Sequence, residues 1–214
     1  MTVQAGFSRP ELKKLESGFD VRKINPKNID LGRHAPGVVN VVVVTPNGSR
    51  KGYRYDSKRR KFVVDCTFGV PVPTDYGWLP QTIGEDNNPL ETMVITRYTA
   101  RPGYIYQARP IGTLKQKNGE HKVICVMLGD DRFARIQDIS DLDNKTIKRI
   151  VSFFEPFFEF DGWLDREETY KLIEESHRRY LDSKSKGKGD AAGNDKMEPS
   201  EEPDRTDRSN PASE

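Results

Sequence analysis

Short hydrophobic stretches separated by turn residues make up the middle of the chain. Residues 38–44 form a β-branched run, V-V-N-V-V-V-V, that stops at Pro46-Asn47-Gly48, and this combination predicts a strand followed by a turn. Residues 53–55 and 62–64 predict a hairpin around the polar residues between them. Further short strands are predicted over residues 92–96, 104–108 and 123–127, with a hairpin turn at Asn118-Gly119 before the last of them.

Toward the C-terminus the apolar positions change to helical spacing. One helix is predicted to begin after Asp143, a good N-cap, and to end or kink at Pro156. A second is predicted to begin at Asp165, with Glu168 completing a capping box. A short helix is also predicted over residues 8–15.

Short strands followed by C-terminal helices favour a mainly β (α+β) fold, a small β-barrel with helices packed on it. Proline and glycine punctuate residues 69–84, which predicts a long ordered loop or several turns. We expect an N-terminal helical arm over residues 1–30, a folded domain over 31–181 and a charged tail over 182–214. The tail lacks aromatic residues and carries six Lys or Arg against nine Asp or Glu, so it is expected to be disordered.

Composition sets limits on location and redox chemistry. The net charge of +2 over 214 residues favours neither an acidic nor a basic partner. No stretch of 18 apolar residues and no secretory signal is visible, so a cytoplasmic protein without a membrane span is expected. Cys66 and Cys125 lie in apolar runs and are expected to be buried, reduced thiols. His34, His121 and His177 lack the spacing of metal ligands.

Residues 86–91, D-N-N-P-L-E, carry the most informative motif. Five further segments accompany it in order, V-V-N-V with P-N-G-S-R within 38–50, D-Y-G-W-L-P at 75–80, P-I-G-T-L-K at 110–115, D-R-F-A-R-I-Q-D-I-S-D-L at 131–142 and F-F-E at 153–155. Together the six segments resemble those of the soluble (family I) inorganic pyrophosphatases, whose metal motif is D-x-D-P-x-D. The resemblance covers about residues 30–181. It implies the family's OB-like five-stranded β-barrel with flanking C-terminal helices.

The resemblance also implies a chemistry that needs Mg²⁺. In that chemistry several Mg²⁺ ions bridge aspartates and the two phosphates of the substrate, and a bridging water is deprotonated as the nucleophile. Mg²⁺ prefers hard, charged oxygen ligands in octahedral geometry. Lysines, an arginine and tyrosines hold the phosphate oxygens.

Several carboxylates of this apparatus are replaced. The family's strand glutamate corresponds to Val44, and the glutamate of its K-Y-E triplet corresponds to Arg54. The central aspartate of the metal motif, which the resemblance implies would activate the water, corresponds to Asn88, and the last aspartate to Glu91. A neutral amide cannot replace a carboxylate as a proton acceptor.

Phosphate contacts are replaced as well. The lysine of the K-Y-E triplet corresponds to Gly52, and the family's V-D-R arginine to Cys66. The pair Phe157-Phe158 stands where the family has Tyr-Lys. The family's acidic hairpin after L-K-M is represented by residues 114–122, which are shorter by about three residues and lack a counterpart of its first aspartate.

Five positions still match the family's functional residues. The resemblance implies a phosphate-binding remnant of Tyr76 and Lys122 and a metal-binding remnant of Asp86, Glu91 and Glu120. The alternative is that Tyr76 packs in the mouth of the barrel and Asp86 caps a turn. No catalytic residue set is intact, and Mg²⁺ binding is expected to be weak or absent.

Two functions follow from these substitutions. The first is a catalytically impaired family member that acts as a binding or structural subunit, as a homo-oligomer or with a protein partner. The alternative is an active Mg²⁺-dependent inorganic diphosphatase with rearranged ligands. A phosphate-containing ligand fits either function, and neither a membrane nor a nucleic acid is expected as a partner.

Three other features leave alternatives open. Seven Lys or Arg between residues 50 and 61 form a basic hairpin, which is either solvated or an anion-binding surface. The tail is either solvated, or it is a docking segment or a screen over a basic surface. Phe157 and Phe158 belong to the core, or they plug the former site or form a protein interface.

Overall fold

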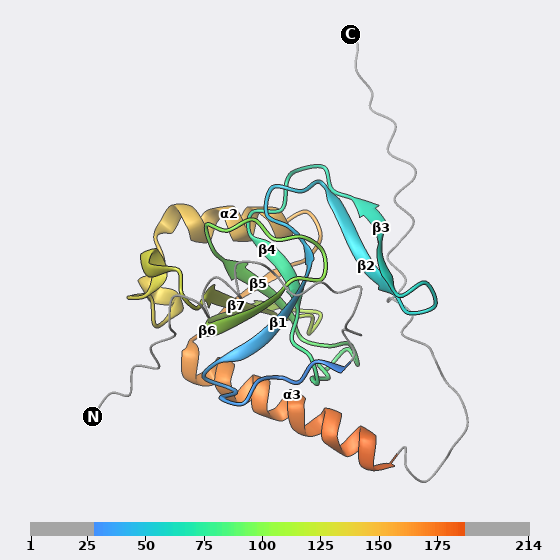
Figure 1. Ribbon diagram of the computed structural model, residues 1–214. Coiled ribbons are helices and arrows are strands. Elements are labelled where there is room, and N and C mark those ends of the chain that lie inside the picture. The colour runs from blue at the N-terminus through green and yellow to red at the C-terminus, as the bar shows by residue number, and fades with distance from the viewer. Residues whose placement is uncertain (1–27, 187–214) are drawn as a thin grey trace.

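The computed structural model describes residues 28–186 (Figure 1). The predicted helix over residues 8–15 and most of the predicted tail lie outside the described residues. In the described part no helix is long and apolar enough to cross a membrane.

Five strands close into a barrel. Their order is β1 (Val39–Thr45), β4 (Asp75–Trp78), β5 (Glu91–Ile95), β7 (Lys122–Met127) and β6 (Ile105–Gln116), and β1 also pairs with β6. All pairings in this ring are antiparallel except the parallel pair β5–β7. The predicted OB-like five-stranded barrel with C-terminal helices is therefore confirmed.

A separate hairpin stands to one side of the barrel. β2 (Lys51–Asp56) and β3 (Lys61–Thr67) pair only with each other in the described sheets, and Figure 1 shows them projecting at the right of the barrel. The Tyr53 backbone N–H reaches the Thr45 hydroxyl oxygen at 3.3 Å, and the Phe62 ring lies 6.3 Å from that of Trp78. These contacts connect the predicted hairpin to the first and fourth strands.

The structure differs from the predicted strands in three places. The predicted loop over residues 69–84 contains β4, which fits against β1 because Gly77 has no side chain: a Cβ there would lie 2.1 Å from the Val42 carbonyl oxygen. β6 continues well beyond residue 108 through a register shift between Pro110 and Gly112. β8 (Phe160–Leu164) was not predicted and adds a sixth strand along β6.

The two predicted C-terminal helices are α2 (Asn144–Phe154) and α3 (Arg166–Lys186). Asp143 caps α2 by accepting a hydrogen bond from the Thr146 backbone N–H. Asp165 and Glu168 form the predicted capping box, with bonds of 2.8 and 3.2 Å. α3 continues through Lys186, past residue 181, where the folded domain was predicted to end. The short 3-10 helices η3 (Asp131–Phe133) and η4 (Ile139–Asp141) precede α2.

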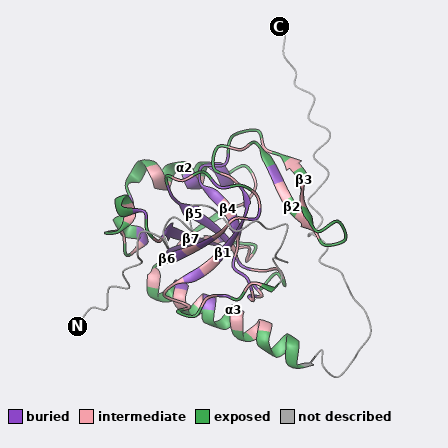
Figure 2. Cartoon of the chain, in the orientation of Figure 1, coloured by how far each residue is buried: buried purple, intermediate pink, exposed green. Residues whose placement is uncertain are grey.

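Alternation along the strands divides the core into two sides. On the α3 side, Val123, Cys125 and Met127 pack in one cluster with Ile173 of α3. On the α2 side, Ile124 and Val126 pack with residues of α2 such as Ile150, Phe153 and Phe154. Figure 2 shows the strands between the helices as the most buried part of the chain. No disulfide joins the two cysteines; Cys125 is buried as predicted, whereas Cys66 is only half-buried.

Candidate functional site

Lys122 is the centre of the candidate site. It begins β7, and the parallel register with β5 places it directly beside Glu91. Its side chain is 2% exposed, and its ammonium group forms a short ion pair with the Glu91 carboxylate and a second one of 3.8 Å with Glu120. Two of the three predicted metal ligands therefore share one lysine.

Tyr76 joins this group from β4. Its phenol lies near Glu91, and burial first and the negative charge of Glu91 next raise the pKa of Tyr76 well above its usual range. Its ring also packs 6.4 Å from that of Phe154, centre to centre. We call Tyr76, Glu91, Glu120 and Lys122 the lysine cluster. Tyr76 therefore both packs against Phe154 and lies beside Glu91.

Aromatic rings from the end of α2 and from the turn that follows it lie over Lys122. The Phe158 backbone N–H donates to the Phe154 carbonyl oxygen at 3.0 Å, so Phe158 follows Phe154 by one helical turn on the same side. The Lys122 ammonium lies 5.2 Å from the centre of the Phe158 ring and 6.0 Å from that of Phe154. Phe158 therefore fills space above the lysine, as the plug interpretation expects, and adds a cation–π contact.

The phosphate-lysine position at Gly52 is closed. A Cβ on Gly52 would lie 2.4 Å from the Cys66 sulfur and 3.1 Å from the Phe68 ring. Phe68 packs in turn against Phe153 and Phe157, with ring centres 5.4 and 6.5 Å apart. The Cys66 sulfur and the Phe68 ring therefore occupy the space that a side chain at residue 52 would need.

Asp86 does not join the lysine cluster. Its two carboxylate oxygens accept hydrogen bonds of 3.1 Å from the backbone N–H and the side-chain amide of Asn88. Asn87 between them has a left-handed backbone, φ 63°. The alternative that Asp86 caps a turn is confirmed, and the amide of Asn88 is occupied in the same turn.

These residues do not fit a Mg²⁺ site. Among the described residues, no group of three or more His, Cys, Asp or Glu is placed to hold a metal ion. Mg²⁺ needs hard anionic oxygens that are free to coordinate it. Glu91 and Glu120 already bind an ammonium group, and Asp86 is turned toward Asn88.

Sequence reasoning missed Phe68 and Gln116. Gln116, where the family's L-K-M has methionine, is 2% exposed, and its amide oxygen and nitrogen have no hydrogen-bond partner in the structure. The change from methionine to a polar residue was the available signal. Phe68 gave no local signal, because its role depends on contacts with α2.

A closed five-stranded barrel with a tyrosine, two glutamates and a lysine gathered at one end is the architecture that the six sequence segments indicate, that of a soluble inorganic pyrophosphatase. The family model for inorganic pyrophosphatase matches residues 41–181, and the chain belongs to this family.

Individual relatives agree with this assignment. The inorganic pyrophosphatase of Sulfolobus acidocaldarius is 40% identical over 137 residues, 61% of this chain and 79% of that protein. The Thermus thermophilus inorganic pyrophosphatase is 33% identical over 171 residues, 73% of this chain and 98% of that protein. The crystal structure of inorganic pyrophosphatase from Thermus thermophilus superimposes with a TM-score of 0.69 at 31% identity, covering 73% of this chain and 99% of that chain. The crystal structure of inorganic pyrophosphatase from Ehrlichia chaffeensis superimposes with a TM-score of 0.66 at 27% identity, covering 70% of this chain and 99% of that chain.

Proposed function

We propose that this protein is a catalytically impaired inorganic pyrophosphatase homologue that acts as a binding or structural subunit. The observation that carries the proposal is the lysine cluster, in which Lys122 is buried between Glu91 and Glu120 under Phe158. In the resemblance, Lys122 would hold a substrate phosphate and the two glutamates would hold metal ions. Here these groups bind one another.

Electrostatics disfavours pyrophosphate at the lysine cluster. A phosphate oxygen that bound the Lys122 ammonium group would displace the carboxylates of Glu91 and Glu120. Their negative charges would then face the negatively charged phosphate. It would also have to move Phe158 off the ammonium group. Separating a buried ion pair is costly because each charge loses its partner in a poorly solvated place. Substrate binding therefore competes with the protein's own ion pairs.

Asn88, at the position of the family's water-activating aspartate, also lacks a group that can act as a base. The Asn88 amide has no lone pair basic enough to take a proton from water, and its nitrogen is bonded to Asp86. Gly52 and Cys66 supply none of the positive charge that the family uses on phosphate. We propose that any Mg²⁺ bound here is held weakly. The partner is then a second copy or another protein, or a phosphate-containing ligand larger than pyrophosphate.

The alternative is an active Mg²⁺-dependent inorganic diphosphatase with rearranged ligands. It is favoured by the gathering of Tyr76, Glu91, Glu120 and Lys122 in one place and by the relatives at 30–40% identity, which are named inorganic pyrophosphatases. It requires that a metal ion replace Lys122 as the partner of both glutamates.

Phosphate release from pyrophosphate distinguishes the two functions. The full chain is assayed with Mg²⁺, Mn²⁺ or Zn²⁺ against a metal-free blank, with the Thermus thermophilus enzyme measured in parallel. The proposal expects turnover at least about three orders of magnitude below that enzyme, because each missing base or phosphate contact costs roughly 10²–10³-fold, non-additively. Turnover in the ordinary range of about 1–10³ per second would establish the alternative.

A restoration variant sharpens the assay. Asn88→Asp alone is expected to leave turnover at the blank, because Gly52, Cys66 and Phe158 still close the phosphate side of the site. Substantial activity from this single change would show that groups other than those at Gly52 and Cys66 hold the substrate.

A further inference from the structure

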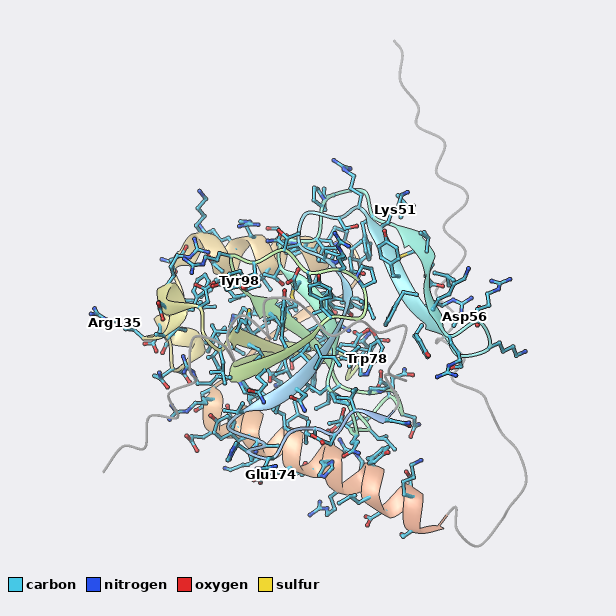
Figure 3. The ribbon with its side chains drawn as sticks, viewed as in Figure 1. Lys51, Asp56, Trp78, Tyr98, Arg135 and Glu174 are labelled. Atoms are coloured by element: carbon cyan, nitrogen blue, oxygen red, sulfur yellow. The ribbon has the colours of Figure 1, made fainter. Side chains whose placement is uncertain are left out.

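The hairpin of β2 and β3 carries a dense positive charge. Seven of the twelve residues from 50 to 61 are Lys or Arg, and Asp56 is the one acid among them. All seven cations are exposed. The four at the turn, Lys58 to Lys61, are consecutive in sequence. In Figure 3, Lys51 and Asp56 mark the two ends of β2 on this projecting hairpin.

Most of this charge has no partner within the described part of the chain. Arg54 pairs with Asp65 at 2.6 Å and Arg59 with Asp56 at 3.4 Å. Lys51, Lys58, Arg60 and Lys61 make no ion pair with any described residue. The pKa of Asp56 is lowered, first by a hydrogen bond from the Arg59 backbone N–H and then by the charges of Arg59 and Arg54. The hairpin therefore presents a positive field with free cations at its turn.

The chain also contains a segment of complementary charge. Residues 198–207, E-P-S-E-E-P-D-R-T-D, hold five carboxylates and one arginine. The segment lacks aromatic and branched aliphatic side chains, so apolar burial cannot direct where it binds. Charge is then the property by which a surface would select it.

The length of chain between the end of α3 and this segment is sufficient. Residues 187–197 follow Lys186, and a connector of this length spans up to about 35–40 Å when extended. A domain of this size has a radius of gyration of about 15 Å. In Figure 1 the end of α3 and the hairpin turn both lie on the right of the molecule.

We propose that the hairpin of residues 50–61 is a docking surface for an acidic peptide segment, and that its occupant is residues 198–207 of the same molecule. The two segments hold five carboxylates and four unpaired cations. Exposed ion pairs are individually weak, but tethering gives the segment an effective concentration of about millimolar. The bound state is expected at low ionic strength and is lost as salt screens the charges.

Carbodiimide cross-linking of the full chain tests the proposal directly, because it joins a carboxylate to an amine only when the two are in contact. At 20 mM NaCl we expect links from residues 198–207 to Lys58 and Lys61 at least about fivefold more often than to Lys145 and Lys148. Those two lysines are exposed on α2 and serve as the internal control. At 0.5 M NaCl, where the Debye length is only about 4 Å, this preference is expected to disappear. Equal linking to all four lysines at low salt would overturn the proposal.

Two additional experiments distinguish the proposed occupant from a second copy of the chain and from a nucleic acid. Mixing ¹⁵N-labelled with unlabelled protein shows whether links form within one chain, as proposed, or between copies, which would contradict it. Adding a 12-nucleotide single-stranded DNA tests a nucleic acid. If the DNA protects Lys58 and Lys61 from modification while the acidic segment does not reach them, the hairpin is a nucleic-acid surface and the proposal is wrong.

The rate of tryptic cleavage gives a second measurement, in which two variants that remove the same negative charge from different places are compared. The tail-neutralised variant E198Q/E201Q/E202Q/D204N/D207N is expected to be cut after residues 58–61 at least about threefold faster than the unmodified chain at low salt. The control variant E155Q/E167Q/E174Q/E175Q/D182N removes the same charge from exposed positions elsewhere and is expected to leave that rate unchanged. Equal rates in the tail-neutralised variant and the unmodified chain would contradict docking.

Discussion

The α2 side and the α3 side of the barrel each bury a charged residue, and they treat it differently. On the α2 side, Lys122 is buried with the carboxylates of Glu91 and Glu120 beside it and two aromatic rings above it. On the α3 side, Asp75 of β4 is fully buried near Tyr106, where one oxygen accepts a 2.7 Å hydrogen bond from the Asn47 backbone N–H and the other has no partner in the structure.

The difference shows two ways in which a folded protein accommodates a buried charge. Lys122 is accommodated by contact with opposite charges, the carboxylates of Glu91 and Glu120. Asp75 is instead pushed toward its neutral form: burial raises its pKa to about 6, against the opposing effect of the Asn47 hydrogen bond. The site lysine is therefore held by ion pairs, whereas the buried Asp75 carboxyl keeps its proton to a higher pH than usual.

The largest expected effect comes from Lys122→Met, which removes the centre of the lysine cluster while keeping much of its volume. Breaking a buried ion pair costs about 3–5 kcal/mol. Since Glu91 is 39% exposed and remains partly solvated, we expect a loss of about 2–4 kcal/mol in the free energy of unfolding, measured by urea titration. Lys115→Met removes a lysine whose pair with Asp161 is far more exposed and is the matched control, expected to cost under about 1 kcal/mol. Equal losses would mean that Lys122 is not held by the cluster.

The next effect concerns Asp75→Asn on the α3 side. Between about pH 4 and pH 6 the folded protein retains the Asp75 proton that the unfolded chain has lost, so this residue lowers stability as pH rises through that range. Above pH 6 the free energy of unfolding is lower by on the order of 2–3 kcal/mol because of Asp75. The amide of the variant is neutral at every pH, so the variant should be more stable by about that amount at pH 7.5 and nearly unchanged at pH 4.

Urea unfolding at both pH values measures this difference. Asp65→Asn, at an exposed hairpin residue, is the control for a generic loss of negative charge. A stability gain for Asp75→Asn that is the same at pH 4 and pH 7.5 would contradict the assignment of the raised pKa.

A smaller effect is expected at the phosphate-lysine position. Gly52→Ala should destabilise the fold by about 1–3 kcal/mol, because its Cβ would meet the Cys66 sulfur at 2.4 Å. The double variant Gly52→Ala/Cys66→Ala should recover part of that loss in thermal unfolding. Gly69→Ala, where a Cβ meets nothing within 4 Å, is the control. An unaffected melting temperature for Gly52→Ala alone would show that the position is still open to a side chain.

How far the sequence predicts this molecule depends on the range of the interactions involved. The strand over residues 39–45 and the caps at Asp143 and Asp165 were predictable, because β-branched runs and capping residues act locally. β4 was not, because it is only four residues long and exists through the close approach of Gly77 to β1. Membership of the family, and with it the barrel, followed from six ordered segments.

The candidate site was predictable in its members and not in their arrangement. Tyr76, Glu91, Glu120 and Lys122 were named from the resemblance, and the structure gathers them, whereas Asp86, named with them, lies outside the cluster. That both glutamates bind Lys122 depends on the parallel register of β5 and β7, which no local pattern encodes. The position of Phe158 over Lys122 depends likewise on how α2 packs across the barrel.

The smallest effect is expected from the charged C-terminal residues. Removal of residues 187–214 takes away almost no apolar surface and should change the melting temperature by no more than about 2 °C. Differential scanning calorimetry of the truncated and full chains measures the change. A fall of about 10 °C would show that these residues contribute to the folded domain on which both buried charges depend.

Isothermal titration of the unmodified protein with Mg²⁺ tests most directly whether the lysine cluster has replaced the metal site. Since Glu91 and Glu120 are engaged by Lys122 and Asp86 by Asn88, we expect binding no tighter than about millimolar, and no change on Asp86→Ala. Micromolar Mg²⁺ binding that Asp86→Ala abolishes would contradict the account, because it would mean that these carboxylates leave their partners and assemble a working metal site.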